Sequence, residues 1–123
     1  MNLPQLNEGE VNAGLCIVDG RFSHWLIMLP ATTYKDLKWH EAFYWAKSVG
    51  GELPTRDESA LLYANVRDQI DQDYWHWTAT QHASGPSSAW LQDFTYGYQY
   101  GNRKDDHYSA RAVRRVPVAG GMK

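Results

Sequence analysis

Residues 39–58 read W-H-E-A-F-Y-W-A-K-S-V-G-G-E-L-P-T-R-D-E, and this stretch predicts two helices in immediate succession. Apolar side chains recur at helical spacing along its first part: Trp39, Ala42, Phe43, Ala46 and Val49. Such a stripe predicts a helix over residues 39–49 that buries one face. We expect Gly50-Gly51 to end this helix. Thr55, followed three residues later by Glu58, forms a capping box that starts a second helix, which we expect to end near Ile70.

The residues before these helices predict a β-hairpin. Two runs rich in β-forming residues, 15–18 and 24–29, flank the turn Asp19-Gly20. The second run is apolar at every position from Trp25 to Leu29, so we expect a central strand that is covered on both faces. We expect Pro30 to end it.

The residues after the helices predict short strands over 74–80, 89–94 and 110–116, with a Tyr-rich hairpin around Gly97 and Gly101. The order of elements predicts an α+β fold, in which two helices pack on a twisted antiparallel sheet with an N-terminal β-hairpin. We expect a flexible arm over residues 1–12, one domain over 13–117 and a disordered tail over 118–123.

Composition limits the classes of function. The chain has 123 residues and a formal net charge of −2, which gives no general attraction to nucleic acid or to an anionic membrane. No apolar run approaches the roughly 18 residues that a membrane span needs, and the first residues do not resemble a signal peptide. The single cysteine, Cys16, predicts a small buried hydrophobe in the reducing cytoplasm of a host cell. Location in a virion is the alternative.

Motifs for catalysis are missing from the sequence. None of the five histidines has the spacing of a metal site, and no nucleophile elbow, phosphate loop or dinucleotide fingerprint occurs. We therefore predict no enzyme, no catalytic residue, no metal and no cofactor. A small enzyme whose site is assembled only by folding stays open as an alternative.

The segment from Tyr96 to Tyr108 is the predicted binding surface. It combines large tyrosine rings with Gly and Asn, which allow tight turns, and protein-recognition surfaces have this composition. Its candidate contact residues are Tyr96, Tyr98, Tyr100, Asn102, Arg103, Lys104, Asp105, His107 and Tyr108. An ordinary hairpin whose tyrosines cover the core is the alternative. We do not expect nucleic acid, because acidic neighbours cancel the charge of Arg103 and Lys104, and because the arginines of the last strand suggest salt bridges.

Four motifs in order resemble the DUF1566 family, also called the Lcl C-terminal domain family, in its phage and prophage form. They are residues 39–55, Y-W-H-W-T at 74–78, A-W-L-Q-D-F at 89–94 and R-A-V-R-R-V at 111–116. The resemblance spans about residues 13–117 and implies a C-type lectin-like fold with Trp90 and Phe94 in the core. His76 and Trp77 replace small residues of the family pattern near an expected surface, so they join the candidate contacts.

The resemblance favours binding over catalysis. The lectin calcium motifs do not occur here, and one cysteine cannot supply the pair that formylglycine-generating enzymes use. We therefore expect a non-catalytic module that recognises a protein partner, for which a host defence complex such as CRISPR–Cas is one candidate. A virion protein that binds a receptor or carbohydrate is the alternative. The sequence leaves a homo-oligomer open.

Overall fold

A computed structural model of the protein describes residues 2–33 and 35–118. Within these ranges the elements, in chain order, are β1 (Val11–Val18), β2 (Arg21–Thr32), α1 (Trp39–Ser48), α2 (Arg56–Val66), the short 3₁₀ helix η1 (Arg67–Gln69), β3 (Trp75–Gln81), β4 (Ser88–Asp93), β5 (Gln99–Arg103) and β6 (Arg111–Pro117). The fold is α+β, as predicted, and the N-terminal hairpin is present. No helix of the described residues combines the length and apolar character that crossing a membrane requires.

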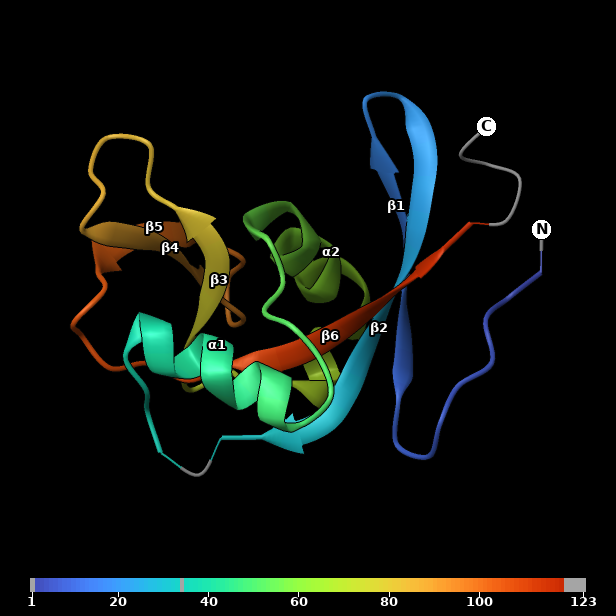
Figure 1. Cartoon of the computed structure of the whole chain (residues 1–123), viewed down its shortest axis with the longest axis horizontal. Helices are drawn as coiled ribbons and strands as arrows, with labels where there is room; N and C mark the ends of the chain where they lie inside the picture. Colours follow the sequence, from blue (N-terminus) through green and yellow to red (C-terminus); the bar gives the residue numbers. More distant parts are fainter. Residues whose placement is uncertain (1, 34, 119–123) are drawn as a thin grey trace.

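The strands form two antiparallel sheets of three strands, with the orders β1-β2-β6 and β3-β4-β5. Figure 1 shows one sheet on each side of α2, which contacts β1, β3 and β4. The expectation of one sheet is wrong, because β6 returns to pair with β2 instead of extending the β3-β4-β5 meander. Both ends of the three predicted C-terminal strands lie within one residue of their predicted positions.

β2 is the central strand that its apolar sequence predicts. It lies between β1 and β6, and Leu26 and Ile27 are completely buried. The strand does not end at Pro30, as expected, but continues to Thr32. Pairing with β6 is irregular between Met28 and Thr32. Proline is tolerated at such an irregularity, because it has no N–H to give to a regular ladder.

The predicted stripe of α1 faces the core. Ala42 and Ala46 are completely buried, and the larger residues of the stripe pack around them. Lys38 is a poor N-cap, but the Glu41 carboxylate accepts a hydrogen bond from the Lys38 N–H at 2.8 Å. At the other end a Cβ on Gly51 would lie 2.7 Å from the Val113 carbonyl oxygen, so only glycine lets the link between the helices pass β6.

The predicted capping box starts α2. The Glu58 N–H donates to the Thr55 hydroxyl at 3.1 Å, and the Glu58 carboxylate accepts from the Thr55 N–H at 2.9 Å. The α-helix ends at Val66, earlier than the expected Ile70, and η1 follows. The Ile70 N–H donates to the Arg67 carbonyl, three residues back, which is the tighter 3₁₀ pattern.

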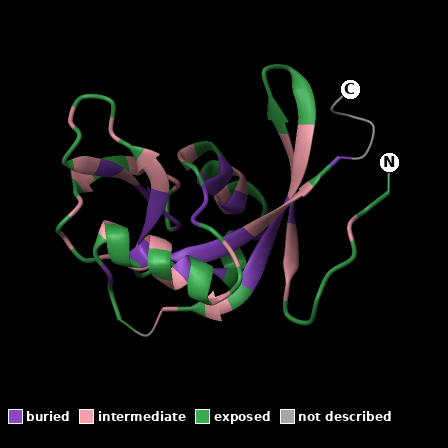
Figure 2. Ribbon diagram, in the orientation of Figure 1, coloured by how far each residue is buried: buried purple, intermediate pink, exposed green. Residues whose placement is uncertain are grey.

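The interior contains two apolar clusters, one against each helix. Figure 2 shows the buried stretches of β2 and β6. β2 contributes Leu29 to one cluster and Leu26 to the other, and β6 contributes Ala112 and Val113 in the same order. Phe94 is in the cluster beside α2, as the resemblance implies. Trp90 is only half-buried, against expectation, and its ring contacts His82 and the Arg56 guanidinium instead of the core.

The predicted boundaries of the domain need one correction. Val118 is buried, and its N–H donates to the Ser23 carbonyl at 3.1 Å, so the expected disordered tail over 118–123 begins too early. The remainder of that tail, 119–123, lies outside the described residues. In the predicted arm, the Glu10 carboxylate and the Gln5 carbonyl both accept hydrogen bonds from Arg114.

Candidate functional site

Four aromatic side chains form a continuous row that we call the aromatic strip: Trp75, Tyr100, Tyr98 and Tyr96. Centroids of successive rings are 4.7, 5.9 and 6.2 Å apart in that order. Trp75 is half-buried, whereas Tyr100, Tyr98 and Tyr96 are 46%, 57% and 74% exposed. The strip therefore begins at the edge of the core and extends into solvent. Tyrosine rings exposed together in this way lose apolar contact with water when a partner covers them.

Hydrogen bonds fix the turn that carries Tyr96 and Tyr98. The Asp93 carboxylate accepts from the Thr95 N–H at 2.9 Å and from the Tyr96 N–H at 3.1 Å. The Thr95 hydroxyl donates to the Gln72 carbonyl at 2.6 Å. The Asp93 N–H donates to the Tyr98 carbonyl at 2.9 Å. Because the turn is already ordered, it would lose less conformational entropy when a partner binds.

Gly97 lets this turn pass directly against α2. Its φ of +84° lies in the left-handed region. A Cβ at this position would lie 2.6 Å from Cε2 of Tyr63. Glycine meets both demands at no steric cost. The Tyr63 ring thus supports the turn between the two most exposed rings of the strip.

Several residues in the second half of the predicted segment hold the loop together. The Asn102 amide donates to the Tyr108 hydroxyl at 2.6 Å, and the Tyr108 ring packs edge-on against Trp77 at 5.2 Å. The Lys104 ammonium lies 4.2 Å from the centroid of the Trp39 ring. Asn102, Lys104 and Tyr108 are each half-buried. These three predicted contact residues therefore form part of the fold.

Three other predicted contact residues, Arg103, Asp105 and His107, are exposed. Arg103 and Asp105 form an ion pair at 3.0 Å, and this pairing lowers the pKa of the Asp105 carboxyl. Both charges remain in contact with water. Both border a cavity of about 430 Å³ beside the start of α1, whose lining includes Lys38, His40 and Glu41 but no residue of the aromatic strip.

His76 and Trp77 do not lie on the surface, so their inclusion among the contact residues is wrong. Their exposed fractions are 5% and 1%. The Trp77 indole donates to the Leu37 carbonyl at 2.7 Å, and the His76 ring packs edge-on against Phe94. β3 is covered on both faces, and burial lowers the pKa of His76 to about 4.

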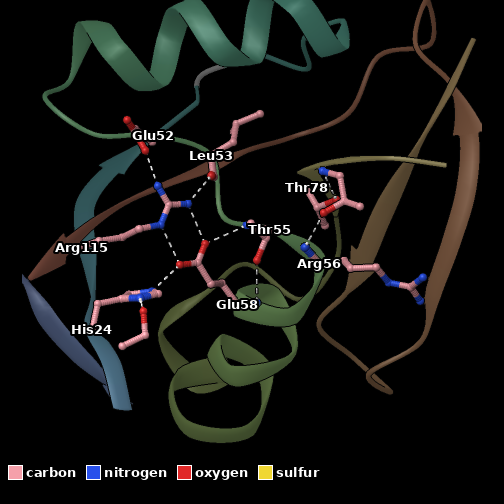
Figure 3. Close-up of polar contacts among 10 residues, drawn as sticks. His24, Glu52, Leu53, Thr55, Arg56, Glu58, Thr78 and Arg115 are labelled. Atoms are coloured by element: carbon pink, nitrogen blue, oxygen red, sulfur yellow. Dashed lines mark hydrogen bonds and ion pairs between the residues drawn. The ribbon is translucent and has the colours of Figure 1, made fainter. Parts of the chain in front are cut away.

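A second polar site, which the sequence analysis did not single out, surrounds the buried carboxylate of Glu58 (Figure 3). Arg115 of β6 donates to both of its oxygens, with Nη2–Oε1 and Nε–Oε2 distances of 2.7 Å. Nε2 of His24, on β2, lies 2.7 Å from Oε2. Arg115 also pairs with Glu52. We call His24, Glu52, Glu58 and Arg115 the Glu58 cluster.

Opposing effects act on the pKa of Glu58. Burial raises the pKa. The hydrogen bonds and the charge of Arg115, together with the hydrogen bond from the Thr55 N–H, lower it by more than burial raises it. The net result is a pKa below the ordinary value for glutamate. Glu58 therefore carries its charge at neutral pH, although it is buried at the first turn of α2.

A β-bulge aims His24 at the cluster. Cys16 pairs with His24, whereas the next residue, Ile17, pairs with Phe22, so Ser23 is an extra residue in β2. The Ser23 hydroxyl lies 2.9 Å from Nδ1 of His24. Contacts at both ring nitrogens therefore fix the orientation of the imidazole.

Cys16 lies beside this cluster. Its sulfur, a ring nitrogen of His24 and a carboxylate oxygen of Glu58 are all within 4.8 Å of one another. A cavity of about 590 Å³ borders all three residues. Cys16 is half-buried, and burial raises the pKa of its thiol to about 11. The prediction of a buried cysteine is therefore wrong, and the spacing of residues in the sequence gave no sign of this arrangement.

The arginines of β6 have different surroundings. Arg114 and Arg115 pair with Glu10 and with the acids of the Glu58 cluster, which confirms the predicted salt bridges. Arg111 instead donates to backbone carbonyls and lines, with His76, a pocket of about 530 Å³. His76 and His24 thus border different cavities.

No protein-family model matches the sequence, and no curated protein matches it. The resemblance to the DUF1566 family therefore stays a prediction.

Proposed function

We propose that this protein is a non-catalytic module that binds another protein through the aromatic strip. The observation that carries the proposal is a row of exposed rings on a turn that is already ordered by hydrogen bonds. Tyrosine and tryptophan dominate the binding energy of many protein interfaces, and each ring can bury roughly 150–250 Å². Arg103, Asp105 and His107 stay predicted contacts outside the strip.

The open edge of β5 supports a protein as the partner. Among the described strands β5 pairs only with β4, so its other edge has backbone groups without a neighbouring strand. An extended segment of a partner can add a strand to such an edge, and its side chains can then contact exposed rings nearby. A carbohydrate could stack on the rings but could not extend the sheet.

The C-type lectin-like fold and a phage or prophage origin are part of this proposal. The two helices and the N-terminal hairpin support the fold part of the proposal. The proposed origin rests on the motif resemblance alone. The partner we propose is a protein inside the host cell, and a defence complex such as CRISPR–Cas is one candidate. A virion protein that binds a receptor or carbohydrate remains the alternative.

The experiment compares wild-type protein with the double variant Tyr98→Ala, Tyr100→Ala in quantitative pull-downs from host lysate. Tyr44→Ala is the matched control, because Tyr44 is 79% exposed on α1 and is not part of the strip. Loss of two central aromatic contacts should weaken capture by about 30-fold or more, whereas the control should capture like the wild type. Equal capture by all three proteins would reject the strip as the contact surface.

A glycan array distinguishes a carbohydrate partner from a protein partner. We expect no glycan whose binding depends on Tyr98 and Tyr100, with or without calcium. A glycan that binds the wild type and the Tyr44→Ala control, but not the double variant, would replace the protein partner with a carbohydrate.

A further inference from the structure

We propose that Cys16, His24 and Glu58 form a binding site for one divalent metal ion of the zinc class. The three residues come from β1, β2 and α2, and their ligand atoms lie within 4.8 Å of one another. Cys16 and His24 are half-buried and Glu58 is buried. The β1–β2 hairpin pairs Cys16 with His24, and the packing of the chain brings the distant Glu58 beside them.

The chemistry of the donors selects the metal. Thiolate sulfur and imidazole nitrogen favour zinc and its neighbours in the first transition row, whereas calcium and magnesium prefer oxygen ligands. Zinc sites that bind a ligand keep three protein donors and an open fourth position. The cavity of about 590 Å³ beside the three donors leaves space for water or a small ligand at that position.

Neighbouring residues already hold two of the donors in place. Arg115 and the Thr55 N–H donate to the Glu58 carboxylate, and the Ser23 hydroxyl lies 2.9 Å from Nδ1 of His24. Hydrogen bonds of this kind orient metal ligands in proteins. The ion would replace the contact between Nε2 of His24 and Oε2 of Glu58, and the ring proton would then be on Nδ1, facing Ser23.

The charge balance also favours a cation. Two carboxylates, Glu52 and Glu58, face one guanidinium, Arg115, so the cluster has one excess negative charge when His24 is neutral. A divalent ion that displaces the thiol proton of Cys16 brings the total to zero, and the proton leaves to solvent. Arg56 and Asp57, which also border the cavity, have opposite charges.

The test is titration of the full chain, without an affinity tag, with Co²⁺ under reducing conditions at neutral pH. A thiolate ligand gives a near-ultraviolet charge-transfer absorption, and we expect it to saturate at one equivalent. Zinc should then displace the cobalt and raise the melting temperature. Absence of the charge-transfer absorption would overturn the proposal.

Three variants make the test specific. Cys16→Ser should abolish the charge-transfer absorption, and His24→Gln should weaken cobalt binding by at least about tenfold. His40→Gln is the control, because His40 is exposed on α1 and its substitution should not change cobalt binding.

The melting temperature without metal shows whether each variant folds. A metal-dependent rise in melting temperature that survives in folded Cys16→Ser would also overturn the site. The site lies apart from the aromatic strip, so either proposal can fail alone.

Discussion

Arg115 and Glu58 are 57 positions apart in the sequence, yet the guanidinium of one donates to both carboxylate oxygens of the other at 2.7 Å. This pair connects β6 to the first turn of α2 (Figure 3). A buried ion pair contributes little net stability, because removing both charges from water is costly. Loss of one partner is much more harmful, because the other charge stays buried without compensation.

Glu58→Gln should lower the free energy of unfolding by about 1.5–3 kcal/mol, because Arg115 loses its charged partner but stays partly exposed and paired with Glu52. Glu52 also pairs with Arg115, but its side chain is 58% exposed, so Glu52→Gln should cost about 1 kcal/mol or less. Urea denaturation of the two variants at pH 7 measures the difference. Equal losses would mean that burial does not set the strength of these contacts.

The buried His76 should make stability fall between about pH 6.5 and pH 4. Burial lowers the pKa of His76 in the folded protein from 6.5 to about 4. Within this window the unfolded chain takes up a proton that the folded protein does not, so the stabilising contribution is complete above pH 6.5 and is lost as pH falls. Urea denaturation from pH 4 to 7.5 should show a flatter profile for His76→Gln. His40→Gln should keep the wild-type slope, and a wild-type slope in His76→Gln would contradict the assignment.

The ion pair between Glu10 and Arg114 should affect stability at lower pH than His76 does. Its hydrogen bond with Arg114 lowers the pKa of Glu10 from 4.5 to about 2. The stabilisation from this pair is present above pH 4.5 and disappears as pH falls towards 2. Arg114→Gln should be less stable than the wild type at pH 5, and the two unfolding free energies should converge near pH 2. Parallel profiles over this range would show that Arg114 does not act through Glu10.

Gly97→Ala should disturb the aromatic strip without removing a ring. Gly97 and Gly20 both have positive φ, so alanine at either position should cost about 1–2 kcal/mol. Only at Gly97 would the new Cβ also meet Tyr63, because nothing lies within 4 Å of a Cβ at Gly20. Urea denaturation should show the larger loss for Gly97→Ala, and partner capture should weaken only in that variant. Equal losses would mean that Tyr63 moves aside easily.

Local signals in the sequence were sufficient for much of the fold. The capping box at Thr55 and Glu58 fixes the start of α2, and the Asp19-Gly20 turn fixes the hairpin. Such features depend on neighbouring residues only. The pairing of β6 with β2 could not be predicted in this way, because nothing within residues 111–117 shows which strand they join.

In the candidate sites, too, the features set by neighbouring residues could be predicted, whereas those set by residues distant in sequence could not. Gly97 and the polar residues around it indicated that Tyr96 and Tyr98 lie in an exposed turn. His76 and Trp77 were misassigned because both faces of β3 are covered by parts of the chain distant in sequence. The meeting of Cys16 with Glu58 depends on the packing of β1 against α2, which spacing along the chain does not reveal.

The pairing of Met28 with Val113 has a consequence for synthesis. β2 is made early on the ribosome, but the strand that completes its sheet emerges only after both helices and the other sheet. Until then Leu26 and Ile27, which are completely buried in the finished protein, lack part of their cover. The domain should therefore complete its folding only after β6 emerges. A nascent chain stopped before residue 111 should expose the unpaired, apolar edge of β2, to which chaperones can bind.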